Sequence, residues 1–140
     1  MELVDLHREE CLRLLADETI GRVVYTEAAL PAAHPVTYCL DRDEVVFRTG
    51  YGSKLAAAAR HRVVGFEVDA YHLPTRTGWS VLGVGVAYEV TDSDRLAALA
   101  ARMPAPWAPD RTEHTIAVPL QRLTGRRLVP AQSRLDSTPA

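Results

Sequence analysis

Cysteine and lysine are both scarce in this 140-residue sequence. Its two cysteines, Cys11 and Cys39, form no CxxC pair, and we expect both to be reduced, buried thiols in a cytoplasmic protein. A domain of this length buries enough apolar surface to fold without a disulfide or a metal. The chain has fifteen arginines but one lysine, Lys54, so this single lysine draws notice.

Features of several other protein classes are also absent. The net charge of −2 provides no basic excess for nucleic acid, and no apolar run is long enough to span a bilayer. The first residues are acidic and lack the basic-then-apolar order of a signal peptide. His7 and Cys11 would supply only two zinc ligands. No P-loop, no GxSxG and no GxGxxG after a strand is present, which excludes a Rossmann dinucleotide site.

The length and composition indicate one globular domain. Hydrophobic residues make up 47% of the chain and charged residues 24%, the usual balance of a soluble protein. We assign residues 1–129 to this domain. The polar, proline-bearing segment 130–140 is expected to be a disordered tail.

Hydrophobic periodicity predicts a mainly β fold with three short helices. Helical periodicity is seen at 8–17, 54–60 and 94–103, with Asp92 or Ser93 as the cap of the third helix. Strands are expected at 20–26, 33–40, 44–49, 62–69, 78–90, 115–118 and 123–128. Gly83 and Gly85 indicate a bend or a close backbone approach in the long strand. Helices follow runs of strands, so we predict an antiparallel barrel with helices outside it or across one mouth.

The segment from Arg48 to Lys54 is the strongest local signal for a ligand. A strand ends there in a glycine-rich turn, and a helix is expected to begin at the pair Ser53 and Lys54. Backbone N–H groups at a helix start bind phosphate, and Thr49 and Ser53 add hydroxyl donors. The alternative is that Ser53 caps the helix while both basic side chains lie in solvent.

Four further segments could contact a ligand. Pro35 interrupts a strand and leaves backbone groups unpaired near Thr37 and Tyr38, whose side chains could donate hydrogen bonds; the alternative is a proline that protects a sheet edge. His34 could transfer protons or be structural. Trp79, Trp107 and the pair Arg126 and Arg127 could reach a ligand or a partner subunit, or be core and solvated residues.

Taken together, these segments resemble the pyridoxamine 5′-phosphate oxidase-like, FMN-binding split β-barrel proteins, and in particular their short actinobacterial branch. The resemblance covers residues 6–128. It is carried by the order and spacing of REEC at 8–11, IGRV at 20–23, PVTY at 35–38, VFRTG at 46–50, GSKL at 52–55, FEVD at 66–69, TRTGWSV at 75–81, PWAP at 106–109 and TGRR at 124–127.

The resemblance implies an antiparallel split β-barrel that forms a homodimer, with two flavin sites at the subunit interface. FMN is the implied cofactor, and no residue is implied as an acid–base catalyst. The implied cofactor contacts fall into three groups: His34, Pro35, Val36, Thr37 and Tyr38 along the flavin ring; Arg48, Thr49, Ser53 and Lys54 at the phosphate; and Trp79, Ser80, Trp107 and Arg126 from the long strand or the partner chain.

The same resemblance leaves the activity open between several alternatives. The first is an oxidoreductase in which the bound flavin transfers hydride or electrons to or from a small molecule. The others are a reductase that uses the deazaflavin coenzyme F-420, a flavin storage protein, and a barrel without cofactor that binds a partner. His34 replaces an expected aliphatic residue, and the substrate-phosphate residues of true pyridoxamine phosphate oxidases have no match, so synthesis of pyridoxal phosphate is not expected.

Overall fold

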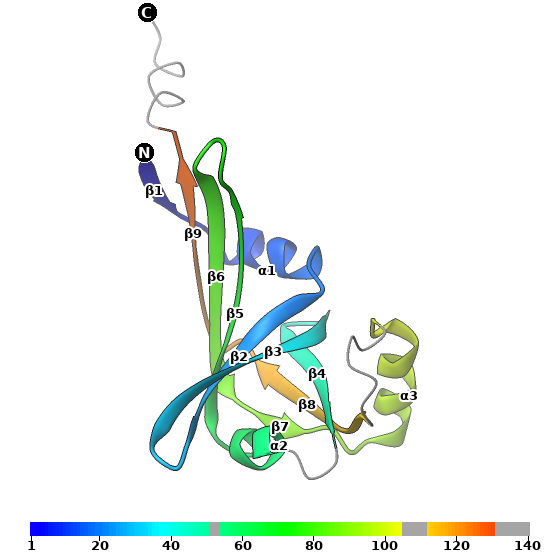
Figure 1. Cartoon of the computed structure of the whole chain (residues 1–140). Helices are drawn as coiled ribbons and strands as arrows, with labels where there is room; N and C mark the ends of the chain where they lie inside the picture. The colour runs from blue at the N-terminus through cyan, green and yellow to red at the C-terminus, as the bar shows by residue number, and fades with distance from the viewer. Residues whose placement is uncertain (51–53, 105–111, 131–140) are drawn as a thin grey trace, which may run out of the picture.

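The computed structural model describes residues 1–50, 54–104 and 112–130 (Figure 1). The expected tail at 131–140 therefore lies outside the described residues. The elements, in chain order, are β1 (Glu2–Asp5), α1 (Arg8–Ala16), β2 (Ile20–Glu27), β3 (Leu30–Asp41), β4 (Glu44–Gly50), α2 (Lys54–Ala59), β5 (Val63–His72), β6 (Thr77–Val86), β7 (Tyr88–Glu89), α3 (Ser93–Arg102), β8 (Thr112–Pro119) and β9 (Arg122–Val129).

The strands form one antiparallel sheet that closes into a barrel. Their order is β1-β9-β6-β5-β2-β3-β4-β8-β7. Only Ala87 separates β6 from β7, and β7 pairs with β8, so the β7 end of the sheet continues directly from β6, the third strand from the other end. Backbone hydrogen bonds join Ala87 N–H to the Arg62 carbonyl and His61 N–H to the Ala87 carbonyl, both at 2.9 Å. The predicted mainly β barrel is confirmed.

The barrel interior is filled by large apolar side chains from facing strands. Val23, Phe47, Phe66 and Ile116 are completely buried, because alternate residues of each strand point inward. Helices α1 and α2 lie at opposite ends of the barrel and add Cys11, Leu15, Leu55 and Ala59 to the same cluster (Figure 1). The sequence pattern therefore places a continuous core inside the sheet.

Two local predictions, the cap of the third helix and the close backbone approach at the glycines, are confirmed. Asp92 caps α3 by accepting a hydrogen bond from Arg95 N–H at 2.9 Å. A Cβ added at Gly85 would lie 1.8 Å from the Pro119 carbonyl oxygen, so the predicted close backbone approach is confirmed.

Three sequence expectations need correction. The strand predicted at 78–90 is interrupted at Ala87, where the backbone bonds to the Arg62 region replace the ladder. Strand β1 was not predicted, since its four residues are mostly exposed and it pairs only with β9. Cys39 is half-buried rather than buried, because it faces away from the barrel interior, whereas Cys11 is fully buried; both thiols are free.

Candidate functional site

Strand β3 changes its pairing partner in mid-course. Residues from Leu30 to Thr37 pair with β2, whereas those from Tyr38 to Asp41 pair with β4. Residues 33–37 therefore have no second neighbouring strand among the described residues, and Arg48–Gly50 of β4 continue beyond the β3 ladder. We call these two unpaired edges the β3–β4 divergence.

The backbone groups at the β3–β4 divergence follow from strand geometry. Tyr38 N–H donates to the Thr19 carbonyl at 3.0 Å, away from β4. Because the backbone groups of successive residues point to opposite sides, those of Thr37 and Pro35 point toward the divergence. Pro35 offers only its carbonyl there, since proline has no N–H. The sequence prediction that Pro35 lies at an unpaired strand edge is confirmed.

Thr49 carries an unsatisfied polar atom next to this edge. The residue is 6% exposed, and its Oγ1 is the one buried side-chain oxygen or nitrogen without a hydrogen-bond partner among the described residues. A buried hydroxyl without a partner costs about 1–3 kcal/mol. The position therefore suits a ligand that brings a strong hydrogen-bond acceptor, such as a phosphate oxygen.

A group of three interacting polar side chains begins beside Thr49, on the adjacent strand β8. His114 of β8 is the ladder partner of Thr49, so both side chains share one face of the sheet. His114 Nδ1 lies 3.1 Å from Glu89 Oε2, and Arg60 Nη2 lies 2.7 Å from Glu89 Oε1. The hydrogen bond from His114, together with the Arg60 charge, lowers the pKa of Glu89. No local sequence pattern predicts this group, because only the ladder register brings its members together.

The predicted phosphate residues do not all lie on one side of β4. Arg48 points to the face opposite Thr49, and its Nη2 donates to the Pro104 carbonyl at 3.3 Å. Lys54 begins α2, four residues after β4 ends, and its side chain lies outside the described part of the structure. Ser53 and Trp107 also lie outside the described residues.

The residues predicted along a flavin ring differ in exposure. His34 and Pro35 are exposed, while Val36 and Thr37 are half-buried. Tyr38 is 1% exposed, its hydroxyl donates to the Leu15 carbonyl at 2.5 Å, and burial raises its pKa. From the sequence we expect the Tyr38 side chain to be able to donate a hydrogen bond to a ligand; in the structure strand alternation turns it into the core, where its hydroxyl already donates to Leu15.

Trp79, Ser80 and Arg126 form a separate group. Trp79 and Ser80 are half-buried in β6, and exposed Arg126 is the ladder partner of Ser80 on β9. Strands β5 and β2 lie between β6 and β3 in the sheet. Within one chain these residues and the β3–β4 divergence therefore belong to different parts of the sheet.

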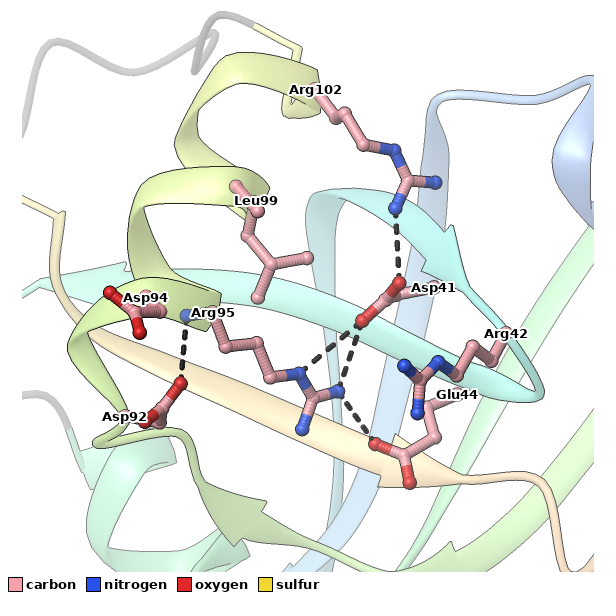
Figure 2. Close-up of a pocket in the computed structure, with 9 residues that line it drawn as sticks. Asp41, Arg42, Glu44, Asp92, Asp94, Arg95, Leu99 and Arg102 are labelled. Carbon is pink, nitrogen blue, oxygen red and sulfur yellow. Dashed lines mark hydrogen bonds and ion pairs between the residues drawn. The ribbon is translucent and has the colours of Figure 1, made fainter.

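A pocket of about 470 Å³ beside α3 is lined by a network of ion pairs that we call the α3 clamp (Figure 2). Arg95 Nη2 lies 2.9 Å from Glu44 and 3.2 Å from Asp41, and Arg102 Nη1 lies 3.0 Å from Asp41. Tyr88 donates to Glu44 and accepts from Arg95 at 2.6 Å. These charges satisfy one another, and they attach α3 to the turn between β3 and β4.

The described parts of the chain contain neither a metal-binding cluster nor a membrane-spanning helix. No group of three or more His, Cys, Asp or Glu side chains there is arranged to hold a metal ion. None of the described helices is long and apolar enough to cross a membrane.

Comparison with known proteins agrees with this architecture. A curated Mycobacterium tuberculosis protein of uncharacterised function is 39% identical over 138 residues, covering 95% of this chain and 90% of that protein. The FAD binding protein from Mycobacterium smegmatis has a TM-score of 0.73 and 30% identity, over 91% of this chain and all (100%) of that chain. A conserved protein of unknown function from Corynebacterium diphtheriae has a TM-score of 0.74 and 26% identity, over 91% of this chain and 98% of that one.

The family model described as pyridoxamine 5′-phosphate oxidase matches residues 7–127, which include both edges of the β3–β4 divergence and nearly all of β9. The chain therefore belongs to the pyridoxamine 5′-phosphate oxidase family.

Proposed function

We propose that the protein binds a flavin at the β3–β4 divergence and acts as a flavin-dependent oxidoreductase. The observation that carries the proposal is the buried Thr49 hydroxyl without a partner, at the place where the resemblance puts a phosphate. Such a hydroxyl can donate to a phosphate oxygen and so satisfy itself. The M. smegmatis relative is described as an FAD binding protein, which supports a flavin rather than an unrelated phosphate ester.

The β3 edge suits the polar rim of a flavin ring. Thr37 offers a backbone N–H and a carbonyl, and Pro35 offers a carbonyl. These β3 groups can therefore pair with a ligand rim on which hydrogen-bond donors and acceptors alternate. The flavin, when bound, supplies the hydride or electron transfer. The chain's own residues would hold the ring, exclude water with Val36 and the core behind it, and neutralise the phosphate with Lys54.

FMN is the flavin that we propose, and FAD is the alternative that the M. smegmatis relative favours. Both carry the same ribityl phosphate, so Thr49 and Lys54 would serve either one. The difference between FMN and FAD must then arise from room for the adenosine half, which titration of both compounds measures directly.

Fluorescence titration of the purified full chain tests the proposal with FMN, FAD, riboflavin and the deazaflavin coenzyme F-420. We expect FMN or FAD to bind at least tenfold more tightly than riboflavin, because a hydrogen bond to a charged group contributes about 1.5–3 kcal/mol. Lys54→Ala should weaken the phosphorylated flavins by about tenfold or more and leave riboflavin unchanged. Equal binding of FMN, FAD and riboflavin would contradict the phosphate assignment.

A matched control removes a positive charge elsewhere. Arg13 is exposed on α1, so Arg13→Ala should leave flavin affinity unchanged.

Preference for the deazaflavin would replace the flavin proposal with an F-420-dependent reductase. Tight flavin binding without reduction by NADH or NADPH would favour a storage protein, and binding of no flavin would remove the enzyme proposal.

A homodimer forms part of this proposal. Val24, Val63, Leu82 and Val86 lie on the outer face of β2, β5 and β6 and are 39%, 65%, 41% and 41% exposed. An exposed apolar face of this kind is typical of protein interfaces. Light scattering should give about twice the chain mass of 15.4 kDa. Leu82→Glu should lower that mass, and Leu30→Glu, at the exposed β2–β3 turn, should not. A monomer at micromolar concentration would contradict the dimer.

A further inference from the structure

Strands β5, β6 and β9 extend past α1 and away from the barrel (Figure 1). Their ends form a pocket of about 440 Å³, within the range of small-molecule sites. We call this pocket the arm groove; its lining includes Ala70, His72, Thr77, Trp79, Arg127 and Val129. None of the residues of the β3–β4 divergence lines it.

Arg127 gives the arm groove an uncompensated positive charge. The residue is half-buried, and its guanidinium makes no hydrogen bond or ion pair with any described residue. A partly buried charge without a partner is costly, and a guanidinium binds a carboxylate or phosphate with two parallel hydrogen bonds. The feature therefore selects an anion.

Trp79 and Ala70 shape the groove for a flat group. Trp79 is the ladder partner of both Ala70 on β5 and Arg127 on β9, so the three side chains lie on one face. The small Ala70 side chain leaves space beside the Trp79 indole. An aromatic ring in that space would contact the indole while its anionic group reaches Arg127.

A short hydrogen-bonded chain of side chains lies at the far end of the groove. Thr75 Oγ1 lies 2.9 Å from His72 Nδ1 and 2.7 Å from Thr77 Oγ1. His72 and Thr77 are ladder partners, on the same face as Trp79. These contacts orient the imidazole ring and provide polar groups for a substituent on the bound ring.

We propose that the arm groove binds a planar aromatic anion, with its ring against Trp79 and its carboxylate or phosphate on Arg127. This site is additional to the proposed flavin site. It also gives Trp79 a role that does not depend on a cofactor.

Isothermal titration of the full chain without flavin tests the groove with 2-naphthoate as the probe. Two ligand controls separate the contributions: 2-naphthamide has the same rings without the charge, and cyclohexanecarboxylate has the charge without an aromatic ring. We expect 2-naphthoate to bind at least tenfold more tightly than either control.

Variants locate the binding site. Arg127→Met should weaken 2-naphthoate about tenfold or more, whereas Arg122→Met, at the exposed start of β9, should not. Ala70→Leu fills the space beside Trp79 and should abolish binding without a loss of thermal stability. The proposal is overturned by equal affinity for 2-naphthamide, by no effect of Arg127→Met, or by no binding of 2-naphthoate.

Failure of this site can be told apart from failure of the flavin proposal. Thr49→Val should leave 2-naphthoate binding unchanged, and the arm groove should bind the probe in the presence of saturating FMN. Displacement of the probe by FMN would overturn a separate site. Binding of 2-naphthoate by a chain that binds no flavin would support the arm groove and contradict the flavin proposal.

Discussion

Replacing Thr49 by valine should raise stability and weaken flavin binding at the same time. Valine has nearly the same shape as threonine but needs no hydrogen-bond partner. The buried Oγ1 has none among the described residues. Leaving such a hydroxyl unpaired costs about 1–3 kcal/mol, so Thr49→Val should raise the free energy of unfolding of the flavin-free protein by about 1–2 kcal/mol. For a chain of 140 residues this corresponds to a Tm increase of about 3–6 °C.

Circular dichroism melts and urea titrations of the flavin-free protein, at one protein concentration, measure this change. Thr115→Val is the matched control: Thr115 is also buried, at 9% exposure, but it lies on the opposite face of the sheet as the ladder partner of Arg48. Its substitution should not increase the Tm. The same Thr49→Val protein should bind FMN about tenfold or more weakly. An unchanged or lower Tm for Thr49→Val would refute the reasoning, because the hydroxyl would then have a partner.

Two further perturbations follow from the charges. Arg95→Met leaves the half-buried Glu44 without its cation and Asp41 with Arg102 alone, so the free energy of unfolding should fall by about 1–3 kcal/mol and amide exchange in α3 should accelerate. Equal exchange in the variant and in Arg13→Met would contradict the α3 clamp. Burial and a hydrogen bond to Asp69 raise the pKa of Glu67 from 4.5 to about 7, so the folded protein holds this proton more tightly than the unfolded chain. The free energy of unfolding should therefore fall as the pH rises from about 5 to about 7. The fall should be less than about 1 kcal/mol, because the site is open to water. Tm measured against pH should show this decrease in the natural chain and lose it in Glu67→Gln.

Strand patterning was sufficient to predict most of the barrel. The alternation in β4 and β5 is strong because one face of each strand is buried, and Asp92 has the side chain that a helix cap requires. Strand β1 has no such pattern, since its stability depends on β9, which is more than 100 residues away in sequence.

The candidate site was predicted less completely, because it depends on register. Pro35 indicates an unpaired edge within its own segment, so the sequence is enough. The inward orientation of Tyr38 and the approach of His114 to Thr49 depend on which residues of β3, β4 and β8 stand opposite one another. No local motif contains that information.

The partner exchange of β3 has a consequence for how such a protein can change over time. The unpaired edge consists of main-chain groups, which every amino acid except proline supplies in full. Most side-chain replacements at positions 33–37 can thus alter the shape and polarity above the edge while its donors and acceptors persist. Single substitutions there can therefore change which ligand is preferred, while the backbone hydrogen bonds that hold the ligand are kept.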